Sequence, residues 1–222
     1  MRAMRNWRSA STTSLLLDCG VLMGPLFVGT ALVAGATRTQ YSPRRHPVSA
    51  LARGGSGWVQ TANFLTAGTL TCLFAVGARR ALRGQPGRTT LPLLLGGAGV
   101  GLLGAGTFVT DPVSGYPPDV PDRTAQRTRT GLVHELFSVP VLLGIPVAAV
   151  THGIQRARRG QRRWAAYSIA SAAVSLTGFL ASGAGFGGMP RYVNWAGLLQ
   201  RVGIVTAFGW MSVLALRLRR NA

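Results

Sequence analysis

Lysine is absent from this 222-residue chain and acidic residues are scarce: there are five, against 24 basic residues that are all arginine. Only 13% of the residues are charged, which is well below the roughly 25% usual in soluble domains. The net charge of +19 would suggest a nucleic-acid ligand if the protein were soluble. Here the arginines lie between long apolar runs, so the composition favours a membrane protein and argues against nucleic-acid binding.

Metal-ligating residues are also few. The two cysteines, Cys19 and Cys72, lie inside apolar runs without ligand spacing, and two cysteines cannot form a disulfide framework. Neighbouring residues such as His134 and Glu135 point about 100° apart on a helix and seldom bind one zinc ion together. His134 and His152 lie roughly 27 Å apart along one helix, which excludes them as joint haem ligands. We therefore predict no metal and no cofactor.

Six apolar runs are long enough to cross a bilayer, which takes roughly 17–25 residues. They occupy residues 15–36, 57–78, 91–109, 131–151, 164–183 and 197–216. The sequence thus predicts an all-α membrane protein, a bundle of six transmembrane helices. A single transmembrane domain, residues 15–216, follows a basic N-terminal segment, 1–14, and precedes a basic tail, 217–222. The first run is too long for the apolar core of a signal peptide, so we interpret it as an anchor.

The distribution of arginine predicts the orientation. Fifteen arginines lie in the N-terminal segment, in the connections after the second and fourth runs and in the tail, where no acidic residue occurs. Eight lie in the longer connections of the other side. The positive-inside rule then places both termini in the cytoplasm, and we expect a multi-pass protein of a bacterial plasma membrane. The cytoplasmic arginine clusters are expected to anchor the topology and to meet anionic lipid headgroups.

Local patterns inside the runs concern helix shape and packing. Prolines predict kinks in the first and fourth runs, at Pro25, Pro140 and Pro146. Small residues four apart predict a close helix contact along Gly97, Gly101 and Ala105. Three tryptophans at span ends suit the aromatic belt of a membrane: Trp58, Trp164 and Trp195.

Polar residues gather at one depth, near the outer ends of the runs. Four of the five acidic residues lie in the stretch 104–135. Asp119 and Asp122 within it are expected to belong to a solvated cover. Arg201 lies about 6 Å inside the sixth run, and we expect it to pair with Asp111 or Glu135, because a charge in the membrane needs a partner.

These residues suggest an outward-facing polar pocket that binds a small polar solute or a lipid headgroup, or handles protons. The candidate ligand-binding residues are Asp111, His134, Glu135, Arg201, Asn63 and Tyr41. The inner half offers only Asp18 and hydroxyl groups. We expect Asp18 to pair with Arg5, Arg8 or the arginines that end the second run.

Two alternatives stay open, and the leading hypothesis is not an enzyme. The first alternative is a structural or scaffold subunit, in which the polar network only fixes the helix packing. The second is an intramembrane lipid hydrolase with Ser42 or Ser114 as nucleophile beside His134 and Asp111, although no Gly-x-Ser-x-Gly turn supports it.

Several short motifs follow one another along the chain. They are Gly24-Pro25, Tyr41-Ser42-Pro43, Pro47-Val48-Ser49-Ala50-Leu51, Asn63-Phe64, Asp111-Pro112, Thr130-Gly131 with His134, and Gly197-Leu198-Leu199-Gln200-Arg201. With these motifs, residues 15 to 216 resemble the domain of unknown function 998 family, six-span membrane proteins of bacteria and archaea. The resemblance implies a fold and a location but no activity. Similar proteins often carry an acidic residue where this chain has Gln200.

Overall fold

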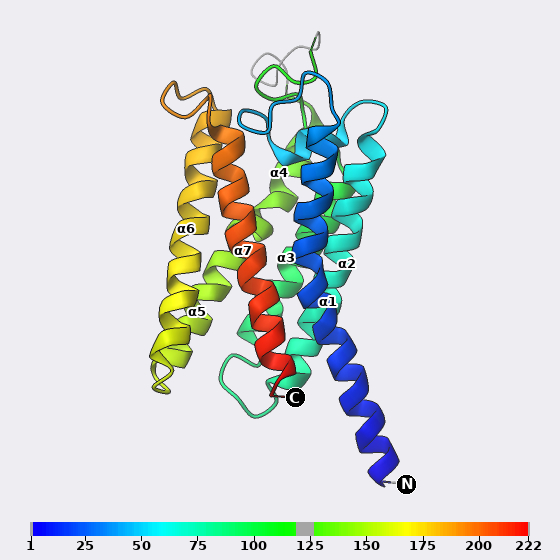
Figure 1. The fold of residues 1–222 in the computed structure, drawn as a ribbon, viewed down its shortest axis with the longest axis vertical. Helices are drawn as coiled ribbons and strands as arrows, with labels where there is room; N and C mark the ends of the chain where they lie inside the picture. The colour runs from blue at the N-terminus through cyan, green and yellow to red at the C-terminus, as the bar shows by residue number, and fades with distance from the viewer. Residues whose placement is uncertain (1, 119–126, 222) are drawn as a thin grey trace.

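The computed structural model describes residues 2–118 and 127–221, with residues 2–10 as backbone only, and Asp119 and Asp122 lie outside it. These ranges are almost entirely helical (Figure 1). The elements are α1 (Arg2–Ala36), the short 3-10 helix η1 (Val48–Ala52), α2 (Gly57–Ala81), α3 (Thr90–Thr107), α4 (Arg129–Leu142), α5 (Gly144–Ala157), α6 (Arg162–Phe186) and α7 (Ala196–Arg219).

Six segments are long and apolar enough to cross a membrane, which confirms the predicted number of spans. Five of them are single helices, and α4 and α5 together form the sixth, Arg129–Ala157. The break between α4 and α5 lies at Leu143, between the two prolines that predicted a kink. Pro146 has no N–H to give to the carbonyl of Leu142, so the regular bonding pattern stops there.

The spans run alternately up and down, so consecutive spans are antiparallel neighbours. Figure 1 shows both chain termini at one end of the bundle, which we name the terminal end. The loops 37–56 and 187–195, and the described parts of the connection between α3 and α4 (108–118 and 127–128), lie at the opposite end, named here the far end. Along the bundle, α1 packs between α2 and α7, α3 packs against α2, α4 and α5, and α6 packs against α5 and α7.

Glycines bring the helices into close contact. A Cβ on Gly20 would lie 2.5 Å from the ring of Phe74, and one on Gly77 would lie 2.9 Å from Leu16 Cβ, so α1 and α2 nearly touch in their terminal halves. On α3 the close contact with α2 is made at Gly99, where an added Cβ would lie 2.5 Å from Cys72 Sγ. The predicted row starting at Gly97 is thus only partly used, because Gly97 faces open space.

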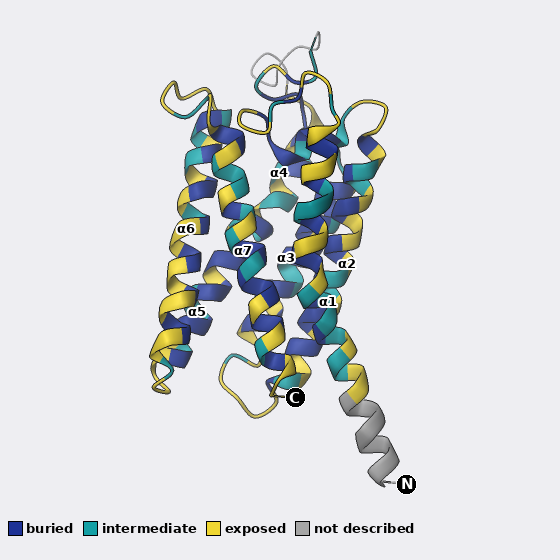
Figure 2. Ribbon diagram, in the orientation of Figure 1, coloured by how far each residue is buried: buried dark blue, intermediate teal, exposed yellow. Residues whose placement is uncertain are grey.

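The outward faces of the helices are apolar and exposed, as a lipid-facing surface requires (Figure 2). Trp58 and Trp195 are 70% and 48% exposed, which suits the predicted aromatic belt. Trp164 does not fit that prediction, because it is buried against α5 and α7. Asp18 also has a different partner from the predicted ones: it pairs with Arg219 at 2.8 Å, since α1 lies beside α7.

Candidate functional site

Arg201 at the far end is surrounded by backbone carbonyl groups. Its Nη1 donates to the carbonyl oxygens of Pro43 at 2.6 Å, His46 at 3.1 Å and Gly197 at 2.9 Å. Its Nη2 donates to the hydroxyl oxygen of Tyr41. We name Arg201, Tyr41 and the loop carbonyls that they bind the Arg201 clasp. The clasp ties the loop after α1 to the first turns of α7.

The prediction that Arg201 pairs with Asp111 or Glu135 is wrong. Among the described residues Arg201 forms no ion pair, because backbone carbonyls of the loop and the hydroxyl of Tyr41 already accept hydrogen bonds from its guanidinium. Gly197 permits this approach, since a Cβ there would lie 2.5 Å from the carbonyl oxygen of His46 and 2.6 Å from that of Pro43. The same loop satisfies an unpaired amide at the start of α7, because Leu198 N donates to Arg44 O at 3.0 Å.

Gln200, the neighbour of Arg201 in the sequence, also bonds to this loop. Its Oε1 accepts a hydrogen bond of 2.8 Å from Val48 N, at the start of η1. A carboxylate at this position would offer the same kind of acceptor. Gln200 therefore supplies the acceptor without adding a charge.

Asp111 accepts hydrogen bonds from the start of α4 and does not pair with Arg201. Its two carboxylate oxygens accept hydrogen bonds from the amide and the hydroxyl of Thr128, at 3.0 and 2.6 Å. Thr128 is the N-cap of α4 and accepts from Gly131 N at 3.0 Å. Gly131 has no side chain, and a Cβ there would lie 2.1 Å from Asp111 Oδ2.

His134 and Glu135 are adjacent in sequence but face different surroundings. His134 is buried, and its Nδ1 lies 3.0 Å from Ala105 O and 2.8 Å from Phe108 O, so Nδ1 carries the hydrogen and donates to the end of α3. Glu135 pairs with Arg127 at 3.2 Å on the surface. The described contacts of His134 include neither Ser42 nor Ser114, so the geometry gives no support to a hydrolase.

A small cavity of about 60 Å³ lies beside His134. Its polar lining comes from His134 and Ser138 of α4, Ser49 of η1 and Gln200 of α7. Since a water needs roughly 10–15 Å³ of such volume, the cavity can hold a few waters but not a headgroup. Of the six predicted residues, only His134 lines it.

Asn63 lies deeper in the bundle and bridges α2 to α1. Its Nδ2 donates to Phe27 O at 3.0 Å and to Gln60 Oε1 at 3.3 Å. The bond to Phe27 joins α1 and α2 on the far side of the middle of both helices. Asn63 is buried and fixes this contact.

The rings of Tyr41, His46 and Tyr116 form an aromatic cluster at the far end. The ring of Tyr116 lies 5.2 Å from the rings of both Tyr41 and His46. Burial raises the pKa of Tyr41, although Arg201 opposes the shift. Burial lowers the pKa of His46, and the charge of Arg45 lowers it further. His46 is therefore neutral at pH 7, and its Nδ1 accepts the amide hydrogen of Ser42 at 2.9 Å.

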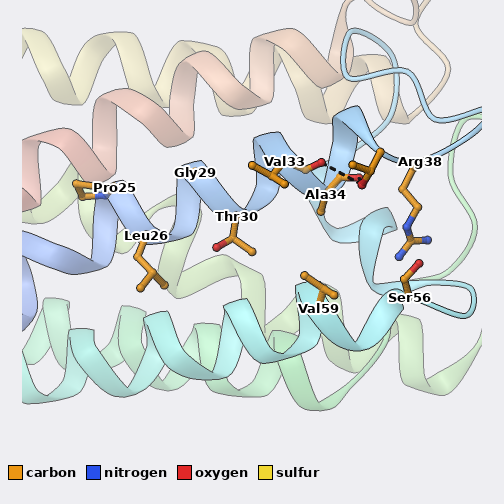
Figure 3. Close-up of a pocket in the computed structure, with 10 residues that line it drawn as sticks. Pro25, Leu26, Gly29, Thr30, Val33, Ala34, Arg38, Ser56 and Val59 are labelled. Carbon is orange, nitrogen blue, oxygen red and sulfur yellow. Dashed lines mark hydrogen bonds between the residues drawn. The ribbon is translucent and has the colours of Figure 1, made fainter.

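A lateral groove lies between α1 and α2 (Figure 3). Its volume is about 590 Å³, within the roughly 300–1,000 Å³ of typical ligand sites. The walls are mainly apolar and include Pro25, Leu26, Val33 and Val59. Gly29 has open space around its Cα, with nothing within 4 Å of an added Cβ. The helices that touch in their terminal halves thus leave a gap in their far halves.

The groove ends at a guanidinium group. Figure 3 shows Arg38 and Ser56 at the far end of the groove. Arg38 Nη1 donates to Arg53 O at 2.7 Å and to the hydroxyl of Tyr116 at 3.4 Å, and Nη2 donates to Leu51 O at 2.9 Å. The Nε–H and one Nη2–H have no partner among residues 2–118 and 127–221. Two parallel donors of this kind match a carboxylate or phosphate.

Local sequence patterns did not predict the groove or its guanidinium group. Arg38 was one arginine among eight in the outer connections, and no local pattern marked the groove. The inner half was predicted to hold no polar residue besides Asp18 and hydroxyls, yet His152 and Arg156 are buried there. Within the described ranges, no three His, Cys, Asp or Glu side chains lie close enough together to hold a metal ion.

Six antiparallel apolar spans and a polar far end define a multi-pass helical membrane protein. The chain belongs to the family described as "Protein of unknown function (DUF998)", whose profile matches residues 21–217. This confirms the resemblance seen in the motifs. Neither the curated proteins nor the solved structures contain a match to the chain.

Proposed function

We propose that this protein binds a lipid with an acidic headgroup in the groove between α1 and α2. The acyl chain lies along the apolar walls, and the headgroup meets Arg38. The observation that carries the proposal is the open, apolar groove that ends at a guanidinium with two unpartnered donors.

The dimensions of the groove agree with one leaflet of a bilayer. From Pro25 to Ala36, α1 rises about 17 Å at 1.5 Å per residue. Half of a hydrocarbon core is about 15 Å thick. An acyl chain whose headgroup lies at Arg38 would therefore reach the level of Pro25.

Charge also supports an acidic headgroup. The two described carboxylates of the far end are already bonded, Asp111 to Thr128 and Glu135 to Arg127. Arg53 lies beside Arg38, and its buried Nε has no described partner. An incoming phosphate or carboxylate would thus meet positive charge, with no unbonded acidic group among the described residues to compete.

The Arg201 clasp contributes to this site indirectly. Tyr41 packs edge-to-face against Tyr116, and the hydroxyl of Tyr116 accepts a hydrogen bond from Arg38. Tyr41 is therefore the one predicted ligand-binding residue that connects to the groove. In the proposed orientation the far end faces outward from a bacterial plasma membrane, because arginines crowd the terminal end.

Native mass spectrometry of the full chain can test the proposal. The protein, purified in a neutral detergent, would be titrated with phosphatidylglycerol and with phosphatidylcholine. We expect phosphatidylglycerol to bind more tightly, and Arg38→Gln to weaken its binding about fivefold, since one arginine near a headgroup contributes about 1 kcal/mol. Equal affinities for the two lipids would contradict the proposal.

A substitution that fills the groove gives the most specific test of lipid binding there. Gly29→Trp would place an indole in the open space and should abolish binding of phosphatidylglycerol. Gly183→Trp, on α6, is the matched control, because Gly183 also has nothing within 4 Å of an added Cβ and lies outside the groove. If both variants bind the lipid as the parent does, the groove is not the site.

The second candidate function is a structural or scaffold subunit, and the Arg201 clasp favours it. Both terminal nitrogens of Arg201 are bonded to the protein itself. A scaffold predicts that Gly29→Trp leaves all lipid affinities unchanged, whereas Arg201→Ala lowers stability. The two candidates therefore differ in the outcome of the groove-filling variant.

A further inference from the structure

The terminal end of the bundle holds a buried arginine that no described carboxylate neutralises. Arg156, near the end of α5, exposes 9% of its surface. It donates from Nε to His152 Nε2 and from Nη2 to Gln85 Oε1, both at 3.4 Å and both to neutral groups. The described carboxylate of this end, Asp18, is paired with Arg219. A buried guanidinium with only long bonds to neutral groups carries an uncompensated charge.

The surroundings of Arg156 are rich in donors and poor in acceptors. Because His152 Nε2 accepts from Arg156, the hydrogen of the imidazole is assigned to Nδ1. That Nδ1 is buried and has no partner within the described part of the chain. Trp164 Nε1 is likewise buried without a described partner, and the ring of Trp164 lies 6.2 Å from that of His152. Buried donors without acceptors are rare and need an explanation.

Two further guanidinium groups belong to this cluster. Arg217 of α7 lies over the ring of Trp164 at 4.9 Å and donates to Gln161 Oε1 at 3.1 Å. The charges of Arg159 and Arg217 both act on Arg156. Arg156 of α5 and Arg217 of α7 therefore contact the same pair of rings, His152 and Trp164, and their described hydrogen-bond acceptors are all neutral. Nothing in this cluster is explained by the groove at the far end.

We propose that this cluster is a binding site for a phosphate group. The oxygens of the phosphate accept hydrogen bonds from Arg156 and Arg217, and Arg159 adds charge at the rim. His152 is a positioning residue, because its bond to Nε fixes the plane of the Arg156 guanidinium. A phosphate supplies both the negative charge and the acceptors that the cluster lacks. The phosphate can belong to a lipid of the adjacent leaflet or to a soluble anion.

The test measures thermal unfolding and binding of the full chain in neutral detergent. One arm compares sodium phosphate with sodium chloride at equal ionic strength, and the other compares phosphatidic acid with phosphatidylcholine. Stabilisation by inorganic phosphate identifies a soluble anion as a ligand, and stabilisation by phosphatidic acid alone identifies a lipid. Either result supports the site, because a ligand of the folded state raises stability. If neither arm stabilises the protein, the proposal is overturned.

Arg156→Gln should weaken the phosphate ligand about tenfold, since charge-assisted bonds are lost. Without ligand, the same variant should be at least as stable as the parent, because it removes an unpaired buried charge. Arg158→Gln is the matched control: it removes the same charge from an exposed position on the same turn and should change affinity less than about twofold. Equal losses in the two variants would show diffuse attraction and overturn the site.

Two additions keep the test decisive. Arg217→Gln changes a half-buried side chain and should also weaken binding, so it replaces Arg156→Gln if that variant does not fold. Repeating the lipid arm in an Arg38→Gln background removes the acidic-headgroup contact proposed for the groove. Binding that persists in this background and is lost with Arg156→Gln belongs to the terminal end. Binding lost with Arg38→Gln and retained with Arg156→Gln contradicts the second site.

Discussion

The two ends of the bundle each hold a largely shielded arginine, and the two side chains differ in how they are satisfied. Arg201 at the far end donates to three carbonyl oxygens and a phenol hydroxyl. Arg156 at the terminal end has two neutral partners, each at 3.4 Å. Neither pairs with a described carboxylate, so net charge alone does not distinguish them. They differ in the number and the length of their hydrogen bonds.

The difference separates a structural arginine from one that is able to bind a ligand. Carbonyl dipoles already solvate Arg201, and an incoming anion would have to displace them. Arg156 loses nothing on binding an anion and gains a counter-charge. A polar residue inside a membrane span is a suspect for function, but the suspicion holds only where its hydrogen bonds are incomplete.

Arg201→Ala should have the largest effect on stability. The variant leaves the carbonyl groups of Pro43, His46 and Gly197 and the hydroxyl of Tyr41 without their donor. We expect the free energy of unfolding to fall by about 3 kcal/mol, as several partners lose one common donor. Thermal unfolding in detergent measures this change.

Arg129→Ala is the control for that experiment, because Arg129 is exposed at the start of α4 on the same end. It should change stability by less than about 0.5 kcal/mol. An Arg201→Ala protein as stable as the parent, but unable to bind phosphatidylglycerol, would reverse the comparison. Arg201 would then belong to the binding site.

Gly197→Ala should have the next largest effect, since it attacks the clasp through the backbone. The new Cβ would lie within 2.6 Å of two carbonyl oxygens that bind Arg201. We expect a loss of about 2 kcal/mol, typical of overpacking at a rigid contact. Gly183→Ala has open space for its Cβ and should be neutral or slightly stabilising in the same thermal measurement. Equal stability of both variants would show that the loop moves freely away from α7.

The spans could be predicted from the sequence, because a run of about twenty apolar residues is the length that crosses the hydrocarbon core of a bilayer. The break in the fourth span followed from Pro140 and Pro146 for a similarly local reason. The polar partners were harder, since they depend on which helices are neighbours. Asp18 was assigned to Arg5, Arg8 or the arginines that end the second run, but α7 lies beside α1, and Asp18 pairs with Arg219.

The candidate site was predicted by depth, and depth was insufficient. Asp111, His134 and Arg201 do lie at the far end, yet their hydrogen bonds go to three separate places: Thr128, the end of α3, and the loop before η1. Backbone carbonyls were the competing acceptors, and a sequence does not show where a loop will direct them. His152 was missed because it follows the fourth apolar run by one residue, whereas the span continues to Ala157.

The pH dependence of the far end should be the smallest of the three effects. Burial, and next the charge of Arg45, lower the pKa of His46 from 6.5, while a backbone contact with Ser114 opposes the shift. The rings of Tyr41 and Tyr116 and the cation Arg201 also face it.

Below about pH 6.5 the unfolded chain therefore takes up a proton at His46 that the folded protein does not, so stability falls as the pH falls. His46→Asn keeps an acceptor for Ser42 N and removes the titration. The difference in melting temperature between pH 7.5 and pH 5.5 should be smaller in the variant than in the parent. His134 and His152 are present in both proteins, so their contribution cancels from the comparison. Identical pH profiles would mean that His46 titrates alike in the folded and unfolded states.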